Sequence, residues 1–431
     1  LIRSRGLGDV YKRQTIFRGG IIPPFFYIHM RGLIKYFLII FFIANASSQD
    51  KLFTIIDPDQ TGIHFSNDLI DTKENNVFLY ANFYGGAGVG VGDFDNDGLD
   101  DLFFAGNLVD DKIYKNLGNL KFQDKTLNSG IINDSSWSTG VTVADVNNDG
   151  LLDIYVSCEL YDDQPKLRTN KLYINKGNFK FDELAAKWNV DVDRRTRHAV
   201  FFDYNRDGLL DLYLLNHPPN TGNFSPFLGT DMKLPEYNLQ LFENKEGFFE
   251  DVTAKAGLDR SGFPNAAVIG DFNKDGWPDI YVANDFEAPD FLYYNNQDGT
   301  FDYKTESSLR HTSFYSMGVD AADINNDSHL DLMVLDMTAE DNFRLKSNMS
   351  GMNPDSFWKV VNDGGHYQYM FNTLQLNNGN ETFSDIAQFT QTAATDWSWA
   401  SLVADFDNDG NKDIYITNGL LCLLYTSPSP R

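Results

Sequence analysis

The sequence predicts an all-β fold, a β-propeller of four-stranded blades. An Asp-rich loop recurs six times, each time between two short strand-like segments, and most copies are followed by an aromatic hairpin. The copies start roughly 50 to 80 residues apart, a spacing near the periods typical of propellers and solenoids. Since no helical periodicity separates them, each copy is expected to mark one antiparallel blade.

The strand before each loop is small or β-branched, as in residues 89–92 (Val-Gly-Val-Gly) and 141–144 (Val-Thr-Val-Ala). Such residues suit the crowded innermost strand beside the channel of a propeller. The strand after each loop reads Asp, then Leu or Ile, and continues with apolar residues, as in 153–156 and 413–416. These two strands and the loop form the inner half of each predicted blade.

The outer half is predicted from a hairpin motif, aromatic-x-Asn-x-Gly, which occurs at 114–118 and 173–177 with longer versions at 294–301 and 376–379. Asn-Gly-type turns between short aromatic-rich strands are typical of β-hairpins. Helical signal is confined to short pieces such as residues 251–258, and residues 338–370 read as an insertion that forms a surface loop. Six loops are visible, and we expect seven blades in the intact protein, closed by further C-terminal sequence or by a strand within residues 53–65.

The loops themselves predict a cation site. The first reads Asp93-Phe-Asp-Asn-Asp-Gly-Leu-Asp-Asp101, which crowds carboxylates at alternate positions around a glycine turn. Such crowding is costly unless a cation neutralises it, and hard Ca²⁺ prefers oxygen ligands in flexible loops. An EF-hand is excluded because it needs an acid at position 12, which here is Phe104 in the first loop and apolar in all the others.

Together these units resemble the FG-GAP/VCBS repeats of the integrin-α-type β-propeller. The run 249–258 also resembles bacterial secreted proteins that join such repeats to an ASPIC/UnbV domain, although no such domain is visible. The resemblance implies that side chains at loop positions 1, 3, 5 and 9, with the position-7 carbonyl, hold up to six structural Ca²⁺ ions. The implied ligands are Asp93, Asp95, Asp97, Asp101, Asp145, Asn147, Asp149, Asp153, Asp203, Asn205, Asp207, Asp211, Asp271, Asn273, Asp275, Asp279, Asp323, Asn325, Asp327, Asp331, Asp405, Asp407, Asp409 and Asp413.

These six sites are predicted to differ in strength. Four loops have Asn at position 3, which lowers the charge of the site, and the fifth has Ser328 where the others have the turn glycine. A residue other than glycine strains a left-handed turn. We therefore expect the first and sixth sites to bind most strongly and the fifth most weakly, in the range of about 10⁻⁴ to 10⁻³ M that is typical of extracellular Ca²⁺ modules.

The ends of the chain do not read as native protein. Residues 4–14 and 422–431 can be encoded by one DNA segment read in opposite orientations, and that segment resembles a sequencing-library adapter. Residues 1–14 and 421–431 are therefore interpreted as artefact and 15–29 as upstream read-through. Residues 30–46 have the basic start, apolar run and small-x-small end of a signal peptide. The propeller is assigned to 47–420, and we expect the natural chain to continue beyond it into further domains.

The charge composition of the chain limits the classes of partner that it can bind. The chain has 61 acidic and 35 basic residues and a net charge of −26. That balance argues against nucleic acid, whose binding rests on Lys and Arg, and against anionic membrane surfaces. Because Cys422 falls in the artefact, Cys158 is the one native cysteine, so metal rather than a disulfide is expected to stabilise the fold.

Two candidate ligand-binding groups stand outside the loops. Arg194, Arg195 and Arg197 form the basic cluster of an acidic chain and could grip an acidic sugar. The alternative is that they pair with nearby acids such as Asp191 and Asp193. His366 and Tyr367 in the insertion could line a pocket or simply pack over a blade. No Ser/His/Asp or Cys/His set has the spacing of a catalytic site, so no catalytic residue is assigned.

Three functions remain open from the sequence. The preferred hypothesis is a secreted, non-catalytic, calcium-binding module at the bacterial outer surface that binds or adheres to an extracellular glycan or surface protein. It has no membrane insertion after signal cleavage. The alternative is the propeller portion of a polysaccharide lyase or hydrolase, with the insertion and the arginine cluster as its site. A structural spacer without a ligand is the third.

Overall fold

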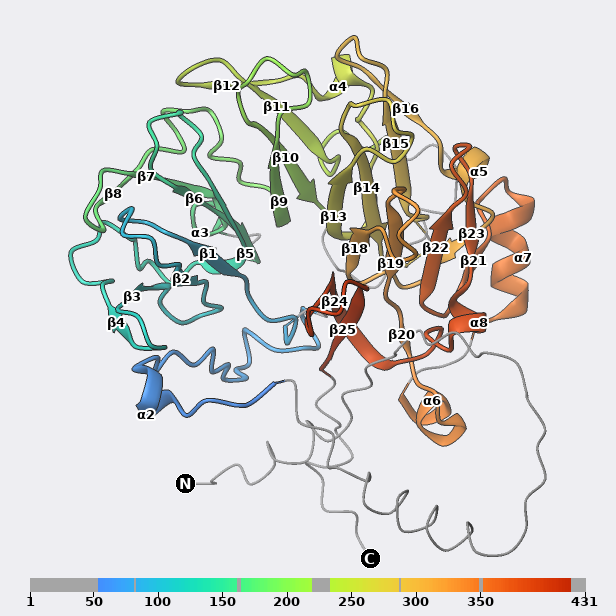
Figure 1. Ribbon diagram of the computed structural model, residues 1–431, viewed down its shortest axis with the longest axis horizontal. Helices are drawn as coiled ribbons and strands as arrows, with labels where there is room; N and C mark the ends of the chain where they lie inside the picture. The colour runs from blue at the N-terminus through green and yellow to red at the C-terminus, as the bar shows by residue number, and fades with distance from the viewer. Residues whose placement is uncertain are drawn as a thin grey trace, which may run out of the picture.

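The computed structural model describes residues 53–80, 83–160, 164–218, 233–286, 288–348 and 352–419. It is an all-β propeller in which six blades follow one another around a central axis, from β1 to β25 (Figure 1). The predicted fold class is therefore confirmed. The predicted adapter-like ends, the read-through segment and the signal peptide lie outside the described residues.

Five blades are antiparallel sheets of four strands, and in four of them the strands pair in chain order without interruption. The first four blades are β1 (Val89–Gly92), β2 (Asp101–Phe104), β3 (Lys112–Asn116) and β4 (Phe122–Asp124); β5 (Trp137–Ala144), β6 (Asp153–Glu159), β7 (Lys171–Asn175) and β8 (Phe181–Glu183); β9 (Thr196–Phe202), β10 (Asp211–Asn216), β11 (Gln240–Asn244) and β12 (Phe249–Asp251); and β13 (Pro264–Gly270), β14 (Asp279–Asn284), β15 (Phe291–Asn295) and β16 (Phe301–Tyr303).

The fifth and sixth blades are less regular. The fifth has β18 (Val319–Ala322), β19 (Asp331–Val334), β22 (Thr373–Asn377) and β23 (Phe383–Asp385), and the sixth has β24 (Asp396–Ala404) and β25 (Asp413–Asn418). Short β20 (Met337–Thr338) pairs with the start of β24, and β17 (Thr312–Ser313) pairs in parallel with β21 (Gln368–Tyr369). The expected seventh blade stays a prediction.

Helices are few and short. The helical turn expected within residues 251–258 is α4 (Thr253–Ala256), which Gly257 ends with a left-handed φ of 78°. The insertion predicted as a surface loop instead contains two helices, α6 (Asn342–Asn348) and α7 (Pro354–Asn362). The others are α2 (Pro58–Thr61), α3 (Pro165–Arg168), α5 (Thr305–Ser308) and α8 (Ala387–Thr390). In the described part of the chain, none of the helices has the length and apolar character needed to span a bilayer.

The core lies between blades. Alternate residues of an inner strand face the preceding and the following blade, so apolar clusters form at each of the five successive blade interfaces. Gly90 shows why small residues are needed there, because a Cβ at this position would lie 2.7 Å from Val141 Cγ1 of the next inner strand. The small residues of β1 are therefore required by close packing against the neighbouring blade as well as by the crowded centre of the propeller.

An asparagine at the end of the third strand ties each of four blades to its predecessor. Asn175 Nδ2 donates to the Leu152 carbonyl of its own loop and to the Phe94 carbonyl of the preceding blade. Asn244, Asn295 and Asn377 repeat this pattern. Asn116 of the first blade donates to its own loop at Asp100 and, among the described residues, to no preceding blade.

The interval between the sixth and first blades differs from the five interfaces. Val89 and Val91 on β1 are 50% and 54% exposed, and Leu402 on β24 is 56% exposed. Phe53 lies edge-on to Phe406 of the sixth blade. Phe65 stacks on the first blade. The 53–65 region therefore contacts both blades, but it forms no strand in the described part of the chain.

Candidate metal centres

All six Asp-rich loops connect the innermost strand of a blade to its second strand, and they therefore gather on one face of the propeller. Neighbouring loops also touch. Asn96 Nδ2 donates to the Gly150 carbonyl of the second loop at 3.0 Å, and Arg206 Nη1 donates to the Gly276 carbonyl of the fourth loop at 3.1 Å. The loops thus form an acidic rim on this face, in which the first four loops are joined by hydrogen bonds.

Each loop is shaped by its first aspartate. In the first loop Asp93 accepts the backbone N–H groups of Asp97 at 3.0 Å and Gly98 at 2.7 Å. This bond pattern is the same in the other five loops. The turn requires a positive φ at position 6, which is 87° at Gly98 and 70° at Ser328. The fifth loop therefore holds a serine in the left-handed region, where glycine is the unstrained residue.

The position-9 aspartate joins the loop to the blade. Asp101 is fully buried, and its carboxylate accepts the N–H groups of Phe94 at 2.9 Å and of Asn116 at 2.7 Å. Burial raises the pKa of the equivalent Asp153 to about 7, and the nearby acids Asp149 and Asp145 add to this. Carboxylates crowded in this way are the environment that a bound cation relieves.

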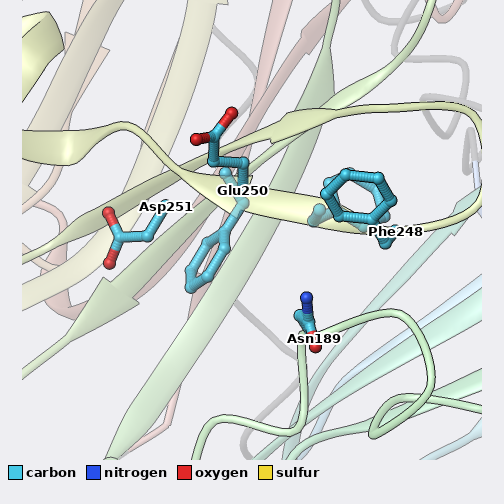
Figure 2. A pocket seen from close by; sticks show the side chains of 6 residues that line it. Asn189, Phe248, Glu250 and Asp251 are labelled. Atoms are coloured by element: carbon cyan, nitrogen blue, oxygen red, sulfur yellow. The ribbon is translucent and has the colours of Figure 1, made fainter.

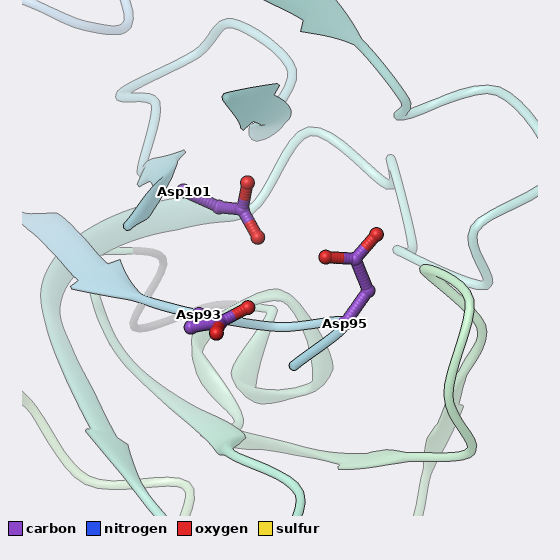
Figure 3. Close-up of side chains that lie close together, drawn as sticks. All are labelled: Asp93, Asp95 and Asp101. Carbon is purple, nitrogen blue, oxygen red and sulfur yellow. The ribbon is translucent and has the colours of Figure 1, made fainter. Parts of the chain in front are cut away.

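The first and sixth loops bring three carboxylates together. Oxygens of Asp93, Asp95 and Asp101 lie within 4.8 Å of one another, as do those of the equivalent acids Asp405, Asp407 and Asp413. Figure 3 shows the first set converging from the loop and the start of β2. Asp95 Oδ1 is buried and makes no hydrogen bond among the described residues. This all-oxygen donor set fits a hard cation such as Ca²⁺.

The four middle loops have asparagine at position 3 and arrange it differently. Asn147 Nδ2 donates to Asp149 Oδ2 at 3.0 Å, and the equivalent asparagines of the next three loops make the same bond. The amide is uncharged, so each of these loops carries one negative charge fewer than it would with an acid at position 3. The predicted ranking of the six sites stays a prediction.

Two charged residues on third strands reach the loops and were not predicted. Lys115 Nζ contacts Asp95 and lies 2.7 Å from Asp97 Oδ2 in the first loop. Hydrogen bonds to Asp95 and Asp97 raise the pKa of the Lys115 ammonium. Glu243 accepts Asn205 Nδ2 at 3.2 Å in the third loop. Both residues occupy the x before Asn in the hairpin motif. A charged residue at that position is the sequence feature that could have revealed them.

Three segments of the chain match the FG-GAP-like repeat, residues 93–156, 271–334 and 357–416. Each segment ends with the second strand of a blade, at β6, β19 and β25, and together they contain five of the six acidic loops. The chain carries FG-GAP-like repeats. The matched segments coincide with the loop-and-strand units of the blades described above.

Known proteins resemble this chain at low identity. Cartilage acidic protein 1 of Xenopus tropicalis is 24% identical over 369 residues, which cover 79% of this chain and 49% of that protein. The chain thus spans about half the length of this curated relative. A lectin of Agrocybe aegerita that recognises non-reducing terminal N-acetylglucosamine has 17% identity and a TM-score of 0.44, covering 76% of this chain and 73% of the lectin. The V. cholerae biofilm matrix protein Bap1 has 13% identity and a TM-score of 0.32, covering 59% of this chain and 35% of Bap1.

The arginine cluster lies at the opposite end of the innermost strand from the acidic loop, at the start of β9. Arg194 Nη1 donates to Asn238 Oδ1 at 2.5 Å, and Arg197 Nη1 pairs with Glu159 Oε2 at 3.1 Å. Asn238 and Glu159 were not predicted as partners, and of the expected acids Asp193 interacts electrostatically with Arg194. Asn238 and Glu159 are distant from these arginines in the sequence and come close only through the packing of the blades, so sequence reasoning could not find them.

Glu159, at the end of β6, organises a buried polar cluster on this face. His217 Nε2 lies 3.0 Å from its carboxylate, and the Tyr80 hydroxyl donates to it. Burial opposes the charge on Glu159, but His217 and Arg197 outweigh that cost and lower its pKa. Sequence reasoning missed this cluster because its members come from the 53–80 segment and from two different blades.

His366 and Tyr367 precede β21 in the insertion. His366 is buried, which lowers the pKa of its imidazole to about 4, whereas Tyr367 is 42% exposed. Phe357 packs against the Tyr367 ring and against Tyr369.

A shallow hollow of about 420 Å³ opens at the outer edge of the third blade (Figure 2). It is lined by Asn189, Phe242, Phe248, Phe249, Glu250 and Asp251. It contains none of the predicted ligand-binding residues, which lie at the inner strand β9 and in the insertion. The side chains that line the hollow include two carboxylates and three phenylalanine rings.

Proposed function

We propose that this chain is a calcium-stabilised propeller that acts outside the cell as a non-catalytic binding module. The observation that carries the calcium part is the convergence of Asp93, Asp95 and Asp101 within 4.8 Å, repeated in the sixth loop. Four other loops keep the same backbone frame with one neutral oxygen donor in place of an acid. Six such sites would join the inner strands of every blade.

Calcium suits these loops better than a softer metal. The available donors are carboxylate, amide and backbone oxygens, and no His or Cys side chain is among the proposed ligands, since His329 at position 7 of the fifth loop would contribute its backbone carbonyl. Hard cations prefer oxygen, and Ca²⁺ tolerates the irregular geometry of a short loop. Bound ions would supply the fixed charges that hold each loop to its blade.

The proposed ligand is an extracellular glycan or another surface protein. It would bind on the face opposite the acidic rim, where Arg194 and Arg195 precede β9 and Arg197 lies near its start. A relative named Cartilage acidic protein 1 supports a role outside the cell and shares the acidic character of this chain, whose net charge is −26. Secretion, and the continuation of the natural chain into further domains, belong to the proposal.

Terbium luminescence tests the metal part directly. Trp277 occupies position 7 of the fourth loop, so its indole lies beside the proposed ion and can sensitise Tb³⁺ emission. We expect emission that calcium displaces, that Trp277→Phe abolishes, and that Asp271→Asn weakens. Emission without calcium competition, or none in the folded protein, contradicts the assignment.

A glycan array, run beside lyase assays on uronic-acid polymers, tests the binding part. We expect a glycan or surface-protein ligand whose binding falls with Arg194→Ala and is unchanged by Arg310→Ala, an exposed arginine elsewhere. Turnover that His366→Ala abolishes without unfolding would instead favour the enzyme. Absence of any ligand would favour the structural spacer.

A further inference from the structure

One position of the third strand places a charged side chain on the metal loop in the first and third blades. It is the residue before the asparagine whose N–H bonds the position-9 aspartate, a bond seen in blades 1 to 5. The residues there are Lys115, Ile174, Glu243, Tyr294 and Leu376. This position therefore carries a positive charge in one blade, a negative charge in another and no charge in three.

Lys115 brings its positive charge into the first loop. Its ammonium contacts Asp95 and lies 2.7 Å from Asp97 Oδ2, and its side chain is 20% exposed. It also lies 5.6 Å from the centre of the Phe179 ring in the second blade. The aspartates that the ammonium contacts are two of the proposed calcium ligands, so the ammonium and the ion would compete for the same oxygens.

Glu243 brings a negative charge to the third loop. Asn205 Nδ2 donates both to Glu243 Oε1 at 3.2 Å and to Asp207 Oδ2 at 3.0 Å, so the two carboxylates converge on one donor. Lys245 pairs with Glu243 at 2.5 Å from the solvent side. The Glu243 side chain is 11% exposed and is therefore held close to the loop.

The two charges compensate the loops beneath them. The first loop has four acids at positions 1, 3, 5 and 9 and receives an ammonium, whereas the third loop has three acids and an amide and receives a carboxylate. Ile174 and Tyr294 instead pack into apolar clusters between blades. The charge of the residue before the third-strand asparagine thus differs from blade to blade, and in the first and third blades it is opposite in sign to the difference in loop charge.

We propose that Lys115 is the resident counter-ion of the first loop, which calcium must displace, and that Glu243 is an additional carboxylate of the third site. The inference rests on the proposed calcium binding. It separates two sites that loop sequence alone ranks together as the strongest, because the first site becomes weaker than the sixth although their four ligand side chains are identical. The first site then fills last among the acid-rich loops and responds to the highest calcium concentrations.

A site-specific reporter tests this in the full chain. Leu99 at position 7 of the first loop is 37% exposed, so Leu99→Trp in a Trp277→Phe background places one sensitising indole beside the first site. Calcium displacement of Tb³⁺ is then measured with and without Lys115→Met. Lys112→Met is the matched control, since Lys112 lies on the same strand but pairs with Asp124 outside the loop.

We expect Lys115→Met to raise the calcium affinity of the first loop about tenfold, the scale of losing two partly exposed ion pairs, and Lys112→Met to leave it unchanged. In chelator, Lys115→Met should lower the melting temperature, because the aspartates lose their counter-charge. An unchanged or weaker calcium affinity in Lys115→Met, with the parent reporter binding normally, overturns the inference alone. A parent reporter that binds no ion overturns the proposed function as well.

The third site gives an independent arm. Leu209→Trp in the same background reports on this loop, and Glu243→Gln is expected to weaken its calcium affinity several-fold. Glu250→Gln is the control, because Glu250 contacts the same Lys245 at 4.0 Å but stays exposed on the outer strand. Equal affinities in Glu243→Gln and Glu250→Gln contradict the role of Glu243.

Discussion

Asn295 in the fourth blade donates a hydrogen bond of 2.8 Å to the Tyr204 carbonyl in the metal loop of the third blade. The same amide donates to the Pro278 carbonyl of its own loop at 3.2 Å. Metal loop, third strand and neighbouring blade are therefore one hydrogen-bonded unit. A change in any loop is expected to affect the interface beside it.

The first prediction compares two asparagines. Both substitutions remove the bond that Oδ1 accepts from the hairpin turn, from Gly118 N in one case and Gln297 N in the other. Asn295→Ala also removes two Nδ2 bonds, one within the blade and one between blades, whereas Asn116→Ala also removes the single Nδ2 bond to Asp100. Urea unfolding should show Asn295→Ala to be the more destabilising by about 1 kcal/mol, the net value of one hydrogen bond. Equal losses would mean that the inter-blade bond contributes nothing.

The second prediction concerns position 3 of the sixth loop. Asp407→Asn gives this loop the same position-3 amide as the middle loops, which lowers its charge by one. Isothermal titration should show weaker binding at one site, with a melting temperature that falls in calcium and is unchanged in chelator. Asp182→Asn, an exposed acid on β8, should change neither. A drop in chelator alone would assign Asp407 a structural role without metal.

The third prediction concerns the strained turn of the fifth loop. Ser328 has a φ of 70°, so Ser328→Gly is expected to stabilise the protein by about 0.5 to 1 kcal/mol. Ser307→Gly in α5 should destabilise it by a similar amount, because glycine is a poor helix former. Denaturant melts of both variants check the two signs. Destabilisation by Ser328→Gly would show that the serine side chain stabilises the loop by more than the strain of its backbone costs.

The fourth prediction concerns pH. Burial raises the pKa of Asp285 to about 8, with a further contribution from Asp336. An unfolded carboxyl loses its proton near pH 4 whereas the folded one keeps it until about pH 8, so this group lowers stability as pH rises across that window. Asp285→Asn should therefore match the parent near pH 4 and exceed it by about 1 kcal/mol or more at pH 9.

Unfolding in saturating calcium at several pH values measures that difference. Taking it between variant and parent at each pH cancels the titration of groups that both proteins share. Parallel curves would show that Asp285 ionises normally in the fold.

The blade pattern could be predicted because it is local. The acidic loop, its flanking strands and the hairpin lie close together in the sequence, and their order determines a four-stranded antiparallel sheet. The convergence of Asp93 with Asp101 likewise follows from a nine-residue loop. The reach of Lys115 does not, because it depends on the register that places β3 beside the loop of its own blade.

Contacts between blades were beyond sequence reasoning. Arg197 finds Glu159 on a neighbouring blade rather than the nearby Asp191 or Asp193, since propeller geometry brings the ends of successive inner strands together. The helices α6 and α7 were missed for a different reason. Their segment is rich in Asn, Met and aromatic residues, and helices of seven and nine residues span too few turns to be distinguished from a loop by sequence.

The central claim is that metal in the acidic rim holds the blades together, and thermal unfolding in calcium and in EGTA tests it most directly. A site loaded tenfold above its dissociation constant adds about 1.4 kcal/mol to the folded state, so six sites predict a melting temperature that falls by many degrees in EGTA and returns when calcium is restored. Coincident melting curves in calcium and EGTA would contradict the account.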